Sequence, residues 1–163
     1  AFVHPIKETL FAKLKKAQRK DMRMESQVTT VEQSQELIQL GVSRYKASMI
    51  WVDRSGYDDA GAIVRPCYNL DIASTIGKVE RNVPAFTIAD LLSIIPKQIQ
   101  FGGSDRRYNL TLGDNGCDGW YFYYEDYNTG PQSRIGLMEH EELLPLLCDR
   151  IEWLITNEYK LIG

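Results

Sequence analysis

The stretch TVEQSQELIQLGVSRYKASMIW, residues 30 to 51, predicts a helix, a glycine stop and a second short helix. Thr30 and Gln33 have the spacing of a capping box, in which each side chain satisfies a backbone N–H group of the first turn. An apolar stripe of about three turns follows, and Gly41 then supplies the left-handed residue that ends many helices. A further helical turn from Ser43 to Ile50 would follow directly.

Two helices joined by a glycine turn suggest a helix-turn-helix, whose second helix lies in the major groove of DNA. Arg44, Tyr45 and Lys46 would then face phosphates or bases. Against this interpretation, Glu36 and Leu37 stand where the motif usually has an apolar residue and a small one. Because short motifs often match by chance, we favour an ordinary helical hairpin packed on a core.

Four segments of the chain occur together in a recognisable order. They are TVEQSQELIQLG, then PAFTIADLLSIIP at residues 84 to 96, a tyrosine-rich hairpin, and IEWLITNEY at residues 151 to 159. Together they resemble small, uncharacterised proteins encoded on prophages and mobile elements of gut anaerobic bacteria. The resemblance covers about residues 28 to 161 and implies no functional residue, because the shared motifs are structural.

The composition is that of one soluble domain. The chain has 163 residues, of which 44% are hydrophobic and 25% charged, which is enough for a real core. No apolar run approaches the roughly 20 residues of a membrane helix, and the start of the chain is not organised like a secretory signal. Cys67, Cys117 and Cys148 are odd in number and widely spaced, which predicts buried thiols in a reducing, cytoplasmic setting.

Charge is distributed unevenly along the chain. Residues 1 to 23 carry a net charge of +5, and the remaining residues carry −8. Apolar residues recur at helical spacing from Ile6 to Ala17, which predicts a basic amphipathic helix in an extension over residues 1 to 25. Its main basic residues are Lys13, Lys15, Lys16, Arg19 and Lys20.

Such a helix is suited to nucleic acid, to an anionic membrane surface or to an acidic protein partner. It is also what an ordinary solvated helix face looks like. The acidic remainder of the same chain is an available partner, so docking within one molecule or self-association would satisfy both charge excesses.

Residues 28 to 161 predict a single α+β domain. A small antiparallel sheet of about three strands is expected from residues 99–101, 108–112 and 120–126, with a further edge strand at 134–138. Helices beginning at Thr30, Thr87 and Glu142 would pack this sheet, and Thr87 has capping-box spacing to Asp90. Residues 52 to 83 predict little beyond a loop and a short strand near residues 62 to 64.

The turn between the strands predicted at 108–112 and 120–126 partly matches the spacing of a calcium loop. Asp114, Asp118, Gly119 and Glu125 have EF-hand spacing, but Gly116 stands where a ligand is needed. The flanking residues favour strands, whereas an EF-hand needs helices. We therefore predict no metal site and expect Asn115-Gly116 at a hairpin tip.

The strand WYFYYEDY carries aromatic side chains on both faces. Trp120, Phe122 and Tyr124 would face the core. The other face, if exposed, would offer a patch that favours a protein partner over nucleic acid, since nearby charges are acidic. That candidate patch consists of Tyr121 and Tyr123 with Tyr108 or Tyr127. Alternatively, helices cover both faces of the sheet.

Catalytic chemistry finds little support in the sequence. His4 and His140 are the only histidines, and neither lies in a motif that pairs it with a nucleophile. We predict no catalytic residue and no cofactor, and the sequence identifies no small-molecule ligand. The favoured function is a non-enzymatic interaction or accessory protein of a phage or mobile element. The alternative is a nucleic-acid-binding accessory protein that uses the basic helix together with Arg44 and Lys46.

Overall fold

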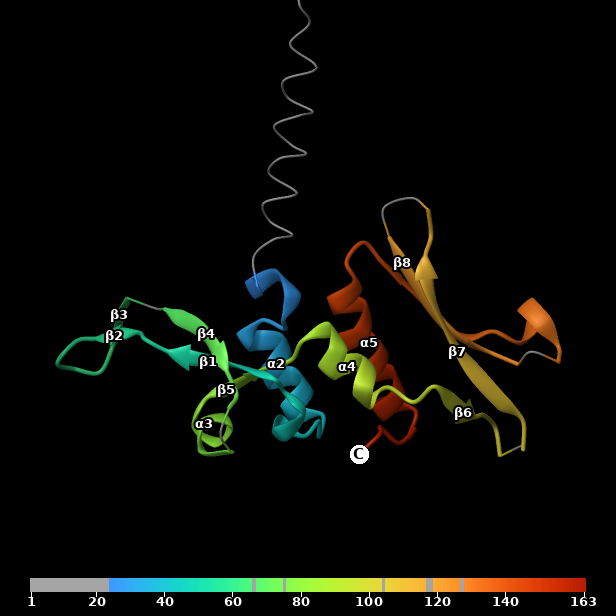
Figure 1. Cartoon of the computed structure of the whole chain (residues 1–163), viewed down its shortest axis with the longest axis horizontal. Helices are drawn as coiled ribbons and strands as arrows, with labels where there is room; N and C mark the ends of the chain where they lie inside the picture. Colours follow the sequence, from blue (N-terminus) through green and yellow to red (C-terminus); the bar gives the residue numbers. More distant parts are fainter. Residues whose placement is uncertain (1–23, 66, 75, 104, 117–118, 127) are drawn as a thin grey trace, which may run out of the picture.

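The computed structural model describes residues 24–163, except 66, 75, 104, 117–118 and 127 (Figure 1). Three helices lie between two antiparallel sheets, and a small hairpin extends from the end of one sheet. The helices are α2 (Val31–Gln39), α4 (Ile88–Ile94) and α5 (Leu143–Thr156). The α+β class predicted from the sequence is confirmed. The prediction of one sheet of about three strands is wrong, because the strands form sheets of four, three and two strands.

The larger sheet has four strands in the order β6-β7-β8-β9, and every neighbouring pair is antiparallel. Its strands are β6 (Gln98–Gln100), β7 (Arg107–Asp114), β8 (Trp120–Glu125) and β9 (Ile135–His140). The predicted pairing of the hairpin is confirmed, with Leu110 opposite Tyr124 and Leu112 opposite Phe122. The edge strand expected near residues 134 to 138 is present as β9.

Both capping boxes predicted from the sequence are formed. Thr30 accepts a hydrogen bond from Gln33 N–H at 3.2 Å, and the Gln33 amide oxygen accepts one from Thr30 N–H at 3.0 Å. Thr87 and Asp90 make the same reciprocal pair at the start of α4. Gly41 follows α2 with a φ of +99°, so the predicted glycine stop is confirmed.

The main core lies where α2, α4 and α5 meet the four-stranded sheet. Helix α5 contacts β8 and β9 directly, and α4 packs against α5. Leu147, Ile151 and Leu154 of α5 are fully buried, and their spacing of three and four residues places them on one face of the helix. Phe122 and Tyr124 of β8 are also fully buried and meet this helix from the sheet.

The second helix predicted after Gly41 is wrong. A single 3-10 turn, η2 (Arg44–Lys46), ends at Ala47, whose backbone is extended, and the chain continues as strand β1 (Met49–Asp53). The run Ile-Trp-Val supplies β-branched and aromatic side chains that suit a strand. The strand is anchored at Ser48, whose N–H donates to the Asp90 carboxylate at 2.9 Å. Without a recognition helix, the helix-turn-helix interpretation is wrong.

A second sheet has the strand order β4-β1-β5. Strand β4 comes from the segment that the sequence left unassigned, and β1 begins where the second helix was predicted. Trp51 of β1 donates from Nε1 to the Thr29 carbonyl at 2.8 Å and packs in a small apolar cluster with Val28 and Ala85. The elements of this region are β2 (Gly56–Tyr57), β3 (Ile63–Arg65), β4 (Tyr68–Ile72), α3 (Ile76–Arg81) and β5 (Val83–Ala85).

The predicted basic extension lies outside the described residues, except for Met24 and Glu25, which begin the 3-10 helix η1 (Met24–Gln27). A second short 3-10 helix, η3 (Gly130–Ser133), precedes β9. In the part of the chain that the structure describes, no helix is long and apolar enough to cross a bilayer.

Candidate functional site

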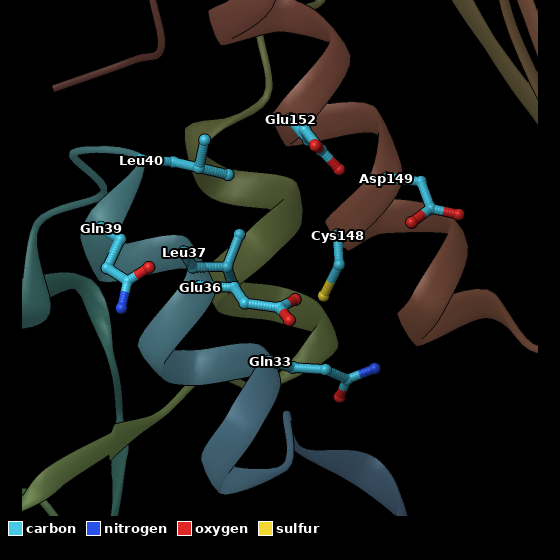
Figure 2. Close-up of a pocket in the computed structure, with 8 residues that line it drawn as sticks. All are labelled: Gln33, Glu36, Leu37, Gln39, Leu40, Cys148, Asp149 and Glu152. Atoms are coloured by element: carbon cyan, nitrogen blue, oxygen red, sulfur yellow. The ribbon is translucent and has the colours of Figure 1, made fainter.

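A cleft of about 230 Å³ opens between α2 and α5 (Figure 2). Three carboxylates line it, Glu36 from α2 and Asp149 and Glu152 from α5. Cys148 lies among them, and Leu37 and Leu40 form part of the apolar wall. The cleft is therefore acidic, and its charge is opposite to that of residues 1 to 23.

The thiol in this cleft is poorly suited to act as a nucleophile. Burial, assisted by the negative charges of Asp149 and Glu36, raises the pKa of Cys148 to about 12. The thiolate is the reactive form of cysteine, and reactive cysteines sit in electropositive surroundings. At neutral pH Cys148 is a protonated thiol beside carboxylates, so the cleft lacks an activated sulfur.

We expect Cys148 to alkylate very slowly in the folded protein. Relative to an ordinary thiol of pKa 9, a pKa of about 12 leaves roughly a thousandfold less thiolate at pH 8. In a variant with Cys67→Ser and Cys117→Ser, iodoacetamide labelling followed by mass spectrometry measures this directly. The rate should still rise about tenfold per pH unit at pH 9 to 10, where an ordinary thiol levels off.

Unfolding the same variant in urea is the matched control, because it returns Cys148 to water. Equal labelling rates at pH 8 for folded and unfolded protein would contradict the assigned environment.

The candidate tyrosines divide between the two faces of the four-stranded sheet. Tyr121 and Tyr123 alternate along β8 with Phe122 and Tyr124, which lie in the main core, so they lie on the other face of the sheet. Their rings stack there with centroids 5.7 Å apart. Tyr108 is buried on the opposite face, in the main core, and so cannot join them. Tyr127 is outside the described residues. The grouping of Tyr108 with Tyr121 and Tyr123 is therefore wrong.

The outer-face pair is largely occupied by its own neighbours. The Arg134 guanidinium lies 4.4 Å from the Tyr123 ring centroid and pairs with Glu125 at 3.1 Å. Gly113 leaves open the space that the Tyr121 ring fills, because a Cβ there would meet the Tyr121 hydroxyl at 2.5 Å. Tyr123 is consequently buried, with Arg134 over its ring.

The basic residues of the nucleic-acid hypothesis are not brought together within the described residues. Arg44 donates to the Glu80 carbonyl at 3.0 Å, and the neighbouring Tyr45 donates to the Glu80 carboxylate at 2.8 Å, so both fold onto α3. Lys46 is half-buried at the end of η2. The other five candidates, Lys13, Lys15, Lys16, Arg19 and Lys20, lie outside the described residues.

The most exposed apolar surface was missed by sequence reasoning. Residues 49 to 72, here called the hairpin arm, run out along β1 and β2 and return along β3 and β4 (Figure 1). Ten large apolar side chains are exposed among the described residues, and half of them belong to this arm, although it is a small part of the chain. The five are Tyr57, Ile63, Val64, Tyr68 and Ile72, which are 42% to 65% exposed.

The arm is held in shape by its own hydrogen bonds. The Tyr57 hydroxyl donates to the Asp53 carboxylate at 2.7 Å, and this bond raises the pKa of the Tyr57 phenol. Arg54 N–H donates to the Cys67 carbonyl at 2.8 Å, joining the two sides between the two ladders. An ordered hairpin therefore presents apolar side chains to solvent, and the sequence signal for it was the apolar pair Ile63-Val64 within a polar stretch.

The hairpin tip at Asn115-Gly116 is as expected, with Gly116 at a φ of +75° and strands β7 and β8 on either side.

Within residues 24 to 163 and outside the gaps given above, no group of three His, Cys, Asp or Glu side chains could hold a metal ion.

Comparisons of the chain with protein-family models, with curated proteins and with solved structures find no match.

Proposed function

We propose that this chain is a non-enzymatic protein-interaction protein and that its hairpin arm is the docking surface. The observation that carries the proposal is the concentration of exposed apolar side chains on an ordered projection. Contiguous apolar surface on a soluble protein commonly marks a protein interface, because exposing it to water is costly. An accessory role in a phage or mobile element agrees with the resemblance described above, but the arm does not depend on it.

The composition of the arm also favours a protein partner. Tyrosine and branched aliphatic residues give large contact area at low entropic cost, which is typical of interface anchors. Nucleic acid would instead require cations around the exposed rings. The Tyr57 hydroxyl donates to the carboxylate of Asp53, which is also opposite Tyr68 across β1 and β4, and this negative charge repels phosphates.

Photocrosslinking tests this function. With a benzophenone amino acid in place of Val64, we expect irradiation of cells that express the chain to give a discrete covalent protein adduct. Val64 is 65% exposed near the tip of the arm, so the probe should meet whichever protein covers it.

Leu137 provides the matched control, because it is 59% exposed on β9, outside the arm. The proposal fails if Val64 gives no adduct, or if the adducts from Leu137 are the same in identity and yield.

A further inference from the structure

We propose that the free edge of β4 pairs antiparallel with β4 of a second copy of this chain, about a two-fold axis at Leu70. The proposal rests on the proposed function and identifies the partner of the arm. Strand β4 pairs with β1 alone in the sheet order β4-β1-β5, so its other edge has no strand beside it in the described part of the chain. Such an edge is a template for another strand.

The hydrogen bonds around β4 show which residues face outward. Ala73 N–H donates to the Ser48 carbonyl at 3.0 Å, and the Cys67 carbonyl accepts from Arg54 N–H at 2.8 Å. Backbone groups alternate in direction along a strand, so the N–H and C=O groups of the odd-numbered residues of β4 point toward β1. The N–H and C=O groups of Tyr68, Leu70 and Ile72 therefore point to the free edge.

One of the outward N–H groups already donates a hydrogen bond to a neighbouring side chain. Ile72 N–H donates to the carboxylate of its neighbour Asp71 at 2.7 Å. That contact satisfies the donor while the edge is unpaired. It is also easily released, because Asp71 has Lys78 at 3.8 Å as a second partner.

The side-chain pattern of β4 is self-complementary about Leu70. With Leu70 opposite its own copy, Tyr68 lies opposite Ile72 of the second molecule, which is a favourable aromatic to β-branched pair. On the other face, Asn69 lies opposite Asp71, so an amide donor meets a carboxylate. All five residues of the strand are then paired.

Neighbouring registers are less favourable. Moving the axis to Asp71 sets two carboxylates directly opposite each other, which destabilises a strand pair. Moving it to Asn69 leaves Ile72 opposite residue 66 of the other copy, a proline with no N–H to donate. The Leu70 axis avoids both penalties.

Pairing at this axis explains the exposed apolar residues at the base of the arm. Tyr68, Leu70 and Ile72 share the face of the sheet that carries Trp51 and Met49, since these residues are directly opposite across β1 and β4. Two such sheets joined edge to edge make one continuous antiparallel sheet. The exposed Tyr68 and Ile72 of each copy then cover one another in an isologous interface.

A disulfide test reads this register directly. In a chain whose three native cysteines are replaced by serine, we expect Leu70→Cys to form a covalent dimer rapidly under mild oxidation. A hydrogen-bonded antiparallel pair has Cα atoms about 5.5 Å apart, which is within the range of a disulfide. Tyr68→Cys in the same background is the matched control, because residue 68 would lie about four residues along the strand from its own copy, about 13 Å away.

Two proline variants provide an independent measurement by sedimentation velocity over a series of concentrations. Leu70→Pro removes an outward N–H group and should keep the monomer folded while reducing dimer formation at least tenfold. Asn69→Pro removes an inward N–H group of the β1 ladder, so its monomer should lose thermal stability. Circular dichroism checks the folding of both variants.

The outcomes separate this inference from the proposed function. A monomeric wild-type chain at every concentration, or equal crosslinking by Leu70→Cys and Tyr68→Cys, overturns the β4 pairing. If the benzophenone probe at position 64 still crosslinks to a different protein in that case, the interaction function survives and only its partner was misidentified. If that probe gives no adduct, both the β4 pairing and the proposed interaction function fail.

Discussion

Replacing Arg150 with alanine should lower the free energy of unfolding by about 3 to 5 kcal/mol, the largest single-residue effect we expect. Arg150 is fully buried in α5 and has no carboxylate partner among the described residues. Burial lowers the pKa of its guanidinium to about 10. Arg150 is thus a buried cation kept in place by groups other than an ion pair.

Two kinds of contact hold this cation. Its Nη2 donates to the Phe122 carbonyl at 3.0 Å and also to the Gly136 carbonyl, at the irregular pairing between β8 and β9. Its guanidinium carbon lies 4.3 Å from the ring centroid of Phe122 and 4.6 Å from that of Trp153. The electron-rich faces of these rings attract the cation. Alanine would remove this attraction, leave a cavity between the rings, and leave the two carbonyls without a hydrogen-bond donor.

Arg150→Met is the matched control, because methionine fills most of the volume but donates no hydrogen bond. We expect it to cost about half as much as alanine, since packing is kept while the carbonyls lose their partner. Urea unfolding monitored by tryptophan fluorescence measures both variants. If Arg150→Met unfolds with the same free energy as the wild-type protein, the hydrogen bonds to the irregular strand pair make no net contribution to stability.

The parts of the fold that the sequence predicted well are those governed by local signals. Thr30 with Gln33 and Thr87 with Asp90 are capping boxes because the interacting groups are three residues apart. The β7-β8 hairpin was likewise predictable, since its turn and its alternating strands are contiguous in the chain.

The parts that failed depend on contacts between distant residues. Residues 43 to 50 satisfy a helical pattern locally, but Asp90 binds Ser48 from 42 positions away and β4 and β5 pair with β1 on both sides. These contacts override a weak local preference. Strand β4 alternates apolar Tyr68, Leu70 and Ile72 with polar Asn69 and Asp71, but the strand is short, and the sequence left this segment unassigned.

The hairpin arm and the acidic cleft could not be located from the sequence for the same reason. Exposure of Ile63 or Val64 is a property of the folded surface, and apolar residues in a sequence are more often buried. Glu36 and Cys148 meet only because α2 and α5 pack together. Arg150 did leave a signal, because it occupies the buried stripe of α5 between Leu147 and Leu154.

Gly136→Ala should destabilise the protein by about 3 kcal/mol, the second large effect we expect. Gly136 has a φ of +62°, which any residue with a Cβ adopts at a cost. A Cβ there would also lie 2.5 Å from Arg150 Nη1 and 2.8 Å from Trp153 Cζ2. The Arg150 guanidinium is fully buried, and the partly buried Trp153 indole packs against the main core, so steric overlap adds to the backbone strain.

Two other glycines separate these causes. Gly116 has a φ of +75° but nothing within 4 Å of an added Cβ, so Gly116→Ala should cost only about 1 kcal/mol of strain. Gly77 lies in α3 with open space and no positive φ, so Gly77→Ala should stabilise by about 0.5 kcal/mol.

The same urea experiment ranks the three variants, and combining Gly136→Ala with Arg150→Ala tests the contact itself. If the guanidinium limits the space at Gly136, the glycine substitution should cost about 1 kcal/mol less once Arg150 is truncated, because residues in contact are energetically coupled. Equal costs in the two backgrounds would show that strain at a φ of +62°, with the remaining overlap at Trp153, accounts for the whole effect.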